Sequence, residues 1–281
     1  MTQAEVSAVS VQNVSLHYGG APVLDNVSFQ LPRGSVVGLV GRNGAGKSTL
    51  LRCLLSLSLP QSGSIQMLGN AVHELSDSTR ERVGYVPQLP DLVEWMTVWQ
   101  HLAYIGSFYP RWSEKGARDL CIRFELPPDL KVKSLSVGDK QKLSIILALA
   151  HDPEVVLMDE PVASLDPMMR REFTRALFDT EQTRTILISN HLLSDLERVV
   201  SYIVFMRHGR VQLMGGWDEL SENLRIVALS EALPKQAGLV AQRLDEGGWR
   251  AIVDKRVLGM QQHAEGGAVP TLDNLFVELN T

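Results

Sequence analysis

Several features that mark special classes of protein are scarce in this sequence. It has 2 cysteines in 281 residues, and Cys53 and Cys121 lie in apolar, helix-like stretches without the spacing of metal ligands. We therefore expect reduced core thiols, as is usual in the cytosol, and no disulfides. The first ten residues contain neither the basic nor the apolar segment of a secretory signal, and no apolar run approaches the roughly 20 residues of a membrane-spanning helix. These absences predict a cytosolic chain that has no membrane span of its own.

Excess positive charge is also missing. The 27 lysines and arginines are outnumbered by 32 aspartates and glutamates, which gives a net charge of −5. Proteins that bind a nucleic-acid backbone usually carry a basic patch or stripe, so we do not expect nucleic acid as the partner. The hydrophobic content of 44% and the charged content of 21% are typical of an ordinary folded protein. At this length the chain can form one large α/β domain with a small appendage.

The order of apolar and polar residues predicts an α/β fold. Residues 6–18 and 23–29 alternate apolar and polar side chains around a glycine-containing turn, which predicts an antiparallel pair of strands. Short apolar runs then alternate with amphipathic stretches, which favours a parallel sheet covered by helices on both faces. The predicted buried strands are 35–40, 83–86, 155–158 and 185–189, and the predicted helices are 47–57, 135–150, 168–179 and 192–200.

Two further regions differ from this alternation. The stretch from residue 87 to about 133 is predicted to be mainly helical and carries aromatic side chains between positions 95 and 112. We expect it to belong to a helical subdomain of about residues 88–150. Beyond residue 215 the pattern loosens to two candidate strands and a terminal helix, which lie at 224–229, 249–253 and 271–279. The predicted division is therefore a domain of residues 1–215 and a C-terminal extension of residues 216–281, whose role stays open.

A phosphate-binding loop lies between a predicted strand and a predicted helix. Its sequence GRNGAGKST fits the pattern G-x-x-x-x-G-K-[ST], and the strand and helix on either side are the context that this pattern requires. The glycines let successive N–H groups surround phosphate oxygens at a helix N-terminus. Lys47 adds positive charge toward the β and γ phosphates, and the Ser48 hydroxyl can ligate Mg²⁺. The residues predicted to bind nucleotide are Gly41, Arg42, Asn43, Gly44, Ala45, Gly46, Lys47, Ser48 and Thr49.

A pair of acids follows the predicted strand 155–158. Ligands of open α/β sheets bind at the carboxyl ends of the strands, which is where Asp159 and Glu160 stand. Asp159 suits the outer shell of a Mg²⁺ site, and Glu160 is placed to orient or deprotonate an attacking water. Alone, the pair could simply cap the next loop. Together with the phosphate loop, it predicts nucleotide hydrolysis.

Residues 135–141, LSVGDKQ, lie shortly upstream of this acidic pair and resemble the signature segment of ABC ATPases, usually written LSGGQ. The order of the motifs is similar to that family over about residues 8–215. The resemblance implies an α/β fold with a P-loop NTPase core of mixed sheet and flanking helices. It also implies an antiparallel β subdomain, an inserted helical subdomain and a small C-terminal α/β extension, with ATP and Mg²⁺ as the bound groups.

The resemblance implies roles for three more residues near the nucleotide. Tyr18 matches the aromatic position that stacks on adenine, and the π-face of a tyrosine suits that contact. Gln88, in VGYVPQ, matches the glutamine that reaches Mg²⁺ or the attacking water and reports nucleotide state to the helical subdomain. His191, in SNH, matches the histidine that contacts the γ-phosphate, although a lone histidine is more commonly a core residue.

Three other residues are implied to act across a dimer. Ser136 and Gly138 would face the γ-phosphate held by the opposite subunit, and Asp166 would position that subunit's site. Each subunit would then be half of an enzyme, in a homodimer or in a pair with a second ATPase. Val137 and Asp139 depart from the usual signature, where glycine and glutamine stand, and the acid at position 139 could weaken or retune the approach to phosphate.

Three short segments resemble one branch of the family. KQKL at 140–143, SFYPRW at 107–112 and DPMMRREF at 166–173 are similar to the ATPases of bacterial ABC-2-type exporters, including antibiotic-resistance and bacitracin-transport types. This implies a separate integral membrane permease and a cytoplasmic location on the inner face of the membrane. An importer ATPase stays an alternative, as does a soluble ABC ATPase acting on ribosomes or nucleic acid. The single cassette and the acidic charge balance speak against the last of these.

Overall fold

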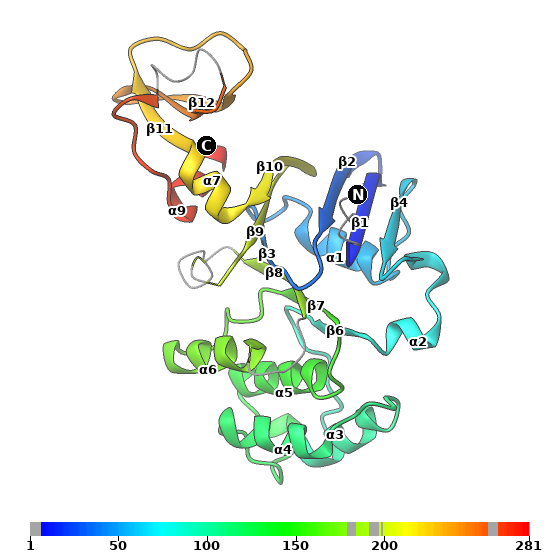
Figure 1. The fold of residues 1–281 in the computed structure, drawn as a ribbon. Coiled ribbons are helices and arrows are strands. Elements are labelled where there is room, and N and C mark those ends of the chain that lie inside the picture. The colour runs from blue at the N-terminus through cyan, green and yellow to red at the C-terminus, as the bar shows by residue number, and fades with distance from the viewer. Residues whose placement is uncertain (1–6, 179–183, 191–196, 198, 258–263, 281) are drawn as a thin grey trace, which may run out of the picture.

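The computed structural model describes residues 7–178, 184–190, 197, 199–257 and 264–280. Its strands form three sheets. Helices α3 to α6 gather on one side of the largest sheet, and the C-terminal strands lie at the opposite end of the molecule (Figure 1). The α/β fold with a mixed sheet, predicted from the sequence, is confirmed.

The largest sheet has six strands in the order β10-β9-β3-β8-β7-β6. Its strands are β3 (Val36–Val40), β6 (Val83–Val86), β7 (Val155–Asp159), β8 (Thr185–Asn190), β9 (Tyr202–Arg207) and β10 (Arg210–Gly216). All neighbours pair in parallel except β10, which pairs antiparallel with β9. The first four of these strands were predicted from the sequence, whereas β9 and β10 were not.

A four-stranded antiparallel sheet covers part of the large one. Its order is β2-β1-β4-β5, and its strands are β1 (Val9–Tyr18), β2 (Ala21–Leu31), β4 (Ser62–Met67) and β5 (Asn70–Ala71). The hairpin β1–β2 is the predicted antiparallel opening.

The helices are short to medium in length. They are α1 (Lys47–Leu54), α2 (Asp77–Arg80), α3 (Val98–Gly106), α4 (Glu114–Arg123), α5 (Val137–Leu149), α6 (Pro167–Phe178), α7 (Trp217–Asn223) and α9 (Leu272–Asn280), with 3-10 turns η1 (Val72–Glu74) and η2 (Val132–Ser134). The predicted helix 192–200 falls mostly outside the described residues.

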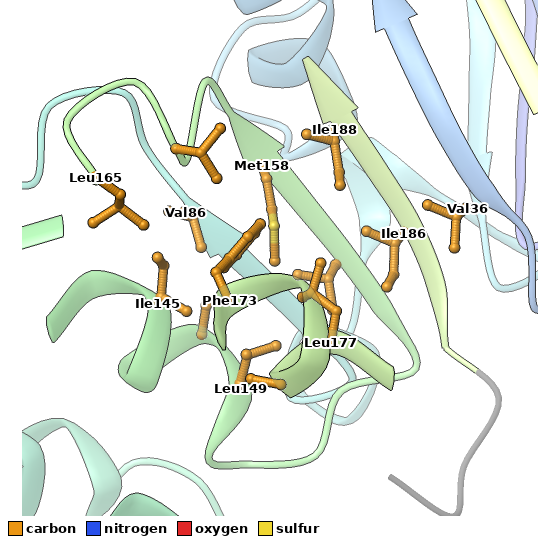
Figure 2. Close-up of a cluster of buried hydrophobic side chains, with 14 of the residues drawn as sticks. Val36, Val86, Ile145, Leu149, Met158, Leu165, Phe173, Leu177, Ile186 and Ile188 are labelled. Carbon is orange, nitrogen blue, oxygen red and sulfur yellow. The ribbon is translucent and has the colours of Figure 1, made fainter. Parts of the chain in front are cut away.

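Both faces of the parallel strands are buried, because successive side chains of a strand point to opposite faces. Val156 and Met158 of β7 join the core formed with α5 and α6, where Figure 2 shows Phe173 against the sheet. Val155 and Leu157 of the same strand join a second core beneath α1 and the antiparallel sheet. This explains the uninterrupted apolar sequence of the strand and holds its carboxyl end rigidly at the sheet edge.

The segment 87–133 is less helical than the sequence analysis predicted. Only α3 and α4 form there, and they occupy less than half of it. Thr97 begins α3 in a capping box with Gln100, but prolines such as Pro90 and Pro127 lie in the connecting turns, where proline interrupts helices. Two of the aromatic side chains in this segment are largely exposed, Trp95 at 71% and Phe108 at 61%.

The chain beyond β10 forms a third sheet of order β11-β13-β12. Its strands are β11 (Leu224–Leu229), β12 (Leu239–Asp245) and β13 (Gly248–Asp254). The terminal helix α9 returns to the large core, where Leu272, Leu275 and Leu279 are buried in the same apolar cluster as Phe205 of β9. The division at residue 215 stays a prediction.

Candidate functional site

The phosphate loop connects β3 to α1, as the sequence pattern predicts. Gly46 stands at the N-cap of α1 with a φ of 101° and provides no side-chain cap. A Cβ atom at this position would lie 2.7 Å from the carbonyl oxygen of Val23, so a side chain would clash as well as strain the backbone. The first N–H groups of α1 are left to point at the loop, which is the arrangement that binds anions.

Lys47 begins α1 and is almost completely buried. Its Nζ donates hydrogen bonds to the carbonyl oxygens of Gly41, at 2.7 Å, and Arg42, at 3.3 Å. Burial lowers the pKa of Lys47, while the nearby carboxylates of Glu160 and Asp159 act in the opposite direction. The ammonium group is thus held across the loop, between its backbone and the two acids.

Asp159 and Glu160 are tied together by a serine on the neighbouring strand. Ser189 Oγ donates to Asp159 Oδ1 at 2.5 Å, and the Glu160 backbone N–H donates to Ser189 Oγ at 3.1 Å. Glu160 has a φ of 47°, an unfavourable value for a residue with a side chain, and such strain is often found at functional sites. Ser189 was not among the predicted residues, because its contact with Asp159 follows from the pairing of β7 with β8.

One cavity of about 310 Å³ brings separately predicted residues together. Gln88 Nε2 donates to Glu160 Oε2 at 3.3 Å, so residues 72 positions apart meet at the cavity. The cavity is lined by Val23, Asn43, Gly44, Gly46, Lys47, Ser48, Thr49, Gln88 and Glu160. The cavity can therefore surround a phosphate group with a lysine, a helix N-terminus and a carboxylate.

Other predicted residues lie away from this lining. Tyr18 ends β1, is 54% exposed and has its hydroxyl 3.4 Å from Ser58 Oγ. Gly41 and Ala45 are buried in the loop, and Arg42 faces a different cavity. Asp159 lies behind Glu160, next to Ser189. His191 lies outside the described residues.

The segment that resembles the signature begins α5. Ser136 is the N-cap: its Oγ accepts a hydrogen bond from the Asp139 N–H at 3.1 Å and donates one to Asp139 Oδ2 at 2.7 Å. Lys142 Nζ lies 3.0 Å from Asp139 Oδ1. Burial raises the pKa of Asp139, but the hydrogen bonds from Ser136 and Lys142 and the charge of Lys142 outweigh it, so that this pKa lies below its ordinary value. The start of α5 thus carries its own ionised carboxylate.

Gly138 and Asp166 lie close to one another in the fold. A Cβ atom on Gly138 would be 2.9 Å from the carbonyl oxygen of Ser164, so α5 packs directly on the segment that precedes α6. Asp166 Oδ1 caps α6 by accepting from the N–H groups of Met168 and Met169, at 2.9 and 3.1 Å. Ser136, Gly138 and Asp166 are absent from the lining of the phosphate-loop cavity.

The protein oxygens near the phosphate loop suit Mg²⁺ only when phosphate oxygens of a nucleotide complete its coordination. Within the described ranges, no group of three or more His, Cys, Asp and Glu side chains could hold a metal ion. Nucleotide-bound Mg²⁺ usually takes one or two protein oxygens, with phosphate oxygens and water completing its coordination. The hydroxyl, amide and carboxylate oxygens of Ser48, Gln88 and Asp159 are the right kind of donors for such a site.

Comparison with known proteins agrees with this geometry. A family model described as ABC transporter matches residues 24–163. The Nod factor export ATP-binding protein I of Ralstonia nicotianae is 34% identical over 221 residues, covering 75% of this chain and 68% of that protein. The chain belongs to the ABC transporter family of ATP-binding proteins. The protein of the same name from Burkholderia orbicola is 35% identical, covering 73% of this chain and 69% of the relative.

The fold of this ABC ATPase also matches a solved structure from the same family. A solved structure described as the ATP binding subunit of an ABC transporter superposes with a TM-score of 0.70 at 30% identity, covering 77% of this chain and 92% of that one. The protein is thus an ATP-binding and ATP-hydrolysing subunit of a transporter. ABC ATPases act as dimers with membrane subunits. In the described part of the chain, no helix combines the length and the apolar composition that crossing a membrane requires.

Proposed function

We propose that this ABC ATPase powers export by a separate membrane permease, through ATP-driven closure of a dimer on the cytoplasmic face of the membrane. The names of the relatives from Ralstonia nicotianae and Burkholderia orbicola, both export ATP-binding proteins, support the direction of transport. The contact between Gln88 and Glu160 carries the proposal, because it joins the hydrolytic cavity to the segment leading into the helical subdomain.

In this proposal the phosphate loop and Lys47 hold the β and γ phosphates of ATP, and Tyr18 stacks on adenine. Ser48, Gln88 and Asp159 would hold Mg²⁺, which neutralises phosphate charge when bound. Glu160 accepts a proton from the attacking water as its oxygen bonds to the γ-phosphorus, and the bond to the bridging oxygen of ADP breaks. Ser189 keeps both acids in place.

Two copies, or one copy with a second ATPase, would complete the sites head to tail. Ser136 and Gly138 of one subunit would face the γ-phosphate in the other, Asp166 would support that site, and His191 would contact the same phosphate from within its own subunit. ATP then favours the closed dimer, and hydrolysis removes the contacts that close it.

A groove beside the helical subdomain supports docking of a permease helix. It has a volume of about 430 Å³ and includes Pro87, His101 and Tyr109 in its lining. Neither ring nitrogen of the buried His101 has a hydrogen-bond partner among the described residues, and a docked helix would cover the apolar side chains of the lining, such as Ile105 and Leu147. Gln141 of α5 donates to the carbonyl oxygen of Pro87 at 3.3 Å, which links the groove to the signature helix.

The helical subdomain of about residues 88–150 would thus transmit dimer closure to the permease. The extension of residues 216–281 stays a predicted C-terminal region next to this ATPase domain. The acidic net charge of −5 supports a partner other than nucleic acid.

The proposed function is tested by measuring phosphate release and by light scattering with MgATP, followed by photocrosslinking from position 108 in membranes. We expect ATP turnover, an ATP-dependent dimer and a crosslink to an integral membrane protein. A neighbouring gene for a binding protein, together with substrate uptake, would instead favour an importer. Crosslinks to ribosomal proteins or RNA would contradict transport altogether.

A further inference from the structure

The C-terminal helix α9 ends against the phosphate loop. Arg42, the second residue of that loop, donates from Nη1 to the carbonyl oxygen of Asn280 at 3.4 Å. Arg207, at the end of β9, donates from Nη1 to the carbonyl oxygen of Leu279 at 3.1 Å. The last carbonyl groups of a helix have no partner within the helix and carry partial negative charge, so guanidinium groups stabilise them.

The other side of α9 is fixed to the C-terminal sheet. Glu278 is buried and forms ion pairs with Arg243 of β12 and Arg250 of β13, both with N to O distances of 2.7 Å. Leu275 and Leu279 are buried in the main core. A shift of the sheet β11-β13-β12 would therefore move α9, and with it the two carbonyl groups that hold Arg42 and Arg207.

The junction encloses a cavity of about 240 Å³ on the outer side of the phosphate loop. Asn43 and Gly44 line both this cavity and the phosphate-loop cavity, so the same backbone separates the two. Asn280 is 6% exposed and lines the outer cavity. Its Nδ2 donates to the carbonyl oxygen of Phe276 at 2.8 Å, and its Oδ1 has no partner among the described residues.

We propose that α9 positions the phosphate loop: the carbonyl group of Asn280 at its end holds Arg42, and the loop takes the shape that receives the phosphates of ATP. Arg42 and Glu278 are then positioning residues, one at the loop and one at the anchor of the helix. The proposal rests on ATP binding by this chain and is independent of the direction of transport and of the permease.

The test is a double-mutant cycle that combines Arg42→Ala with Glu278→Gln in the full-length chain. MgATP affinity is measured with a fluorescent nucleotide in a Glu160→Gln background, and KM and kcat are measured in the parent. We expect each single variant to weaken binding by about 3- to 10-fold through KM, with little change in kcat, because one charge-assisted hydrogen bond is lost or misplaced. Arg42→Lys should restore part of the affinity, since it keeps a donor.

The double variant shows whether Glu278 affects ATP binding through Arg42 or independently of it. If α9 acts through Arg42, Glu278→Gln has no further effect in the Arg42→Ala background. Additive losses, or an unchanged KM in a folded Glu278→Gln variant, would overturn the proposal. Arg243→Gln breaks the same anchor from β12 and replaces Glu278→Gln if that variant does not fold.

A matched control lies on the same extension. Arg256 forms ion pairs with Asp254 and Glu219, neither of which belongs to α9, so Arg256→Ala should leave the KM for ATP unchanged. An equal rise in KM for this variant would show a general effect of perturbing the extension, and would also overturn the proposal.

Discussion

Two helices of this protein begin with segments proposed to face a nucleotide phosphate, and they begin in different ways. Helix α1 has Gly46 as its N-cap, which provides no side-chain cap, and its first residue is the buried cation Lys47. Helix α5 starts at Ser136, whose hydroxyl is engaged with the carboxylate of Asp139. The first helix start presents positive potential to a phosphate, whereas the second places a negative group where a phosphate would approach.

The contrast indicates that the start of α1 is better suited to bind a phosphate group than the start of α5. Lys142 offsets the charge of Asp139 at 3.0 Å, so the start of α5 is neutralised locally and can still accept an anion. Its approach to the γ-phosphate of a partner subunit should nevertheless be weaker than that of a start without an acid. We therefore expect the phosphate loop to dominate ATP affinity and the start of α5 to adjust the rate of closure and hydrolysis.

The largest effect should come from Glu160→Gln. Removing a general base typically lowers turnover by about 10²- to 10⁴-fold, while the phosphate loop remains intact. We expect phosphate release to fall on this scale, with ATP affinity retained and an ATP-held dimer detected by light scattering. Turnover close to that of the wild type would remove Glu160 from the chemical step.

Lys47→Ala should directly weaken the binding of ATP by the phosphate loop. Charge-assisted hydrogen bonds contribute about 1.5 to 3 kcal/mol, so ATP affinity should fall by about 10- to 100-fold. Fluorescent-nucleotide titration measures this, with the exposed Lys133→Ala as the matched lysine control. If both lysine variants bind ATP as the wild type does, the loop is not the main source of affinity.

Ser189→Ala should have an intermediate effect, on the kcat of the site formed with the phosphate loop. The variant removes one hydroxyl that donates to Asp159 and accepts from the Glu160 backbone. Such a bond contributes about 0.5 to 1.5 kcal/mol, which predicts a loss in kcat of about 3- to 10-fold with a smaller change in ATP affinity. Because a loss of folding would also lower the apparent kcat without changing KM, turnover is expressed per nucleotide-binding site counted by fluorescent-nucleotide titration, and a loss that disappears on this scale would contradict the prediction.

The smallest effect on turnover is expected at the start of α5. Asp139→Gln removes the acid at the start of α5, and charge at a helix N-terminus is worth about 0.3 to 1 kcal/mol, so turnover should rise by about 2- to 5-fold. Asp129→Asn, an exposed acid outside the segment, is the control. A fall in turnover for Asp139→Gln would show that the carboxylate assists the site.

Local patterns were sufficient to predict the two best-defined parts of the site. The strand, loop and helix around Lys47 and the buried strand before Asp159 depend on neighbouring residues, and the structure has both. Partnerships between distant segments were not predictable in this way. Ser189 contacts Asp159 because β8 pairs with β7, and Asn280 reaches Arg42 across 238 positions. Neither contact leaves a signal in a short window of sequence.

The prediction of a mainly helical segment from 87 to 133 was wrong in extent for a related reason. Its apolar and aromatic residues suit a helix, but capped starts at Thr97 and Ser113, with Pro110 between them, divide the segment into two short helices with turns. The roles of Tyr18 and His191 stay predictions. The fold class, by contrast, follows from the alternation of buried strands and helices.

The most direct test of the composite site is to mix two variants that are each expected to be inactive. Lys47→Ala disables the phosphate loop but keeps the start of α5, and Gly138→Arg blocks the start of α5 but keeps the loop. A mixed dimer then contains one intact site, so the account predicts that ATP turnover appears on mixing. If Gly138→Arg hydrolyses ATP normally by itself, or if the folded variants gain no turnover when mixed, the site is not shared between subunits.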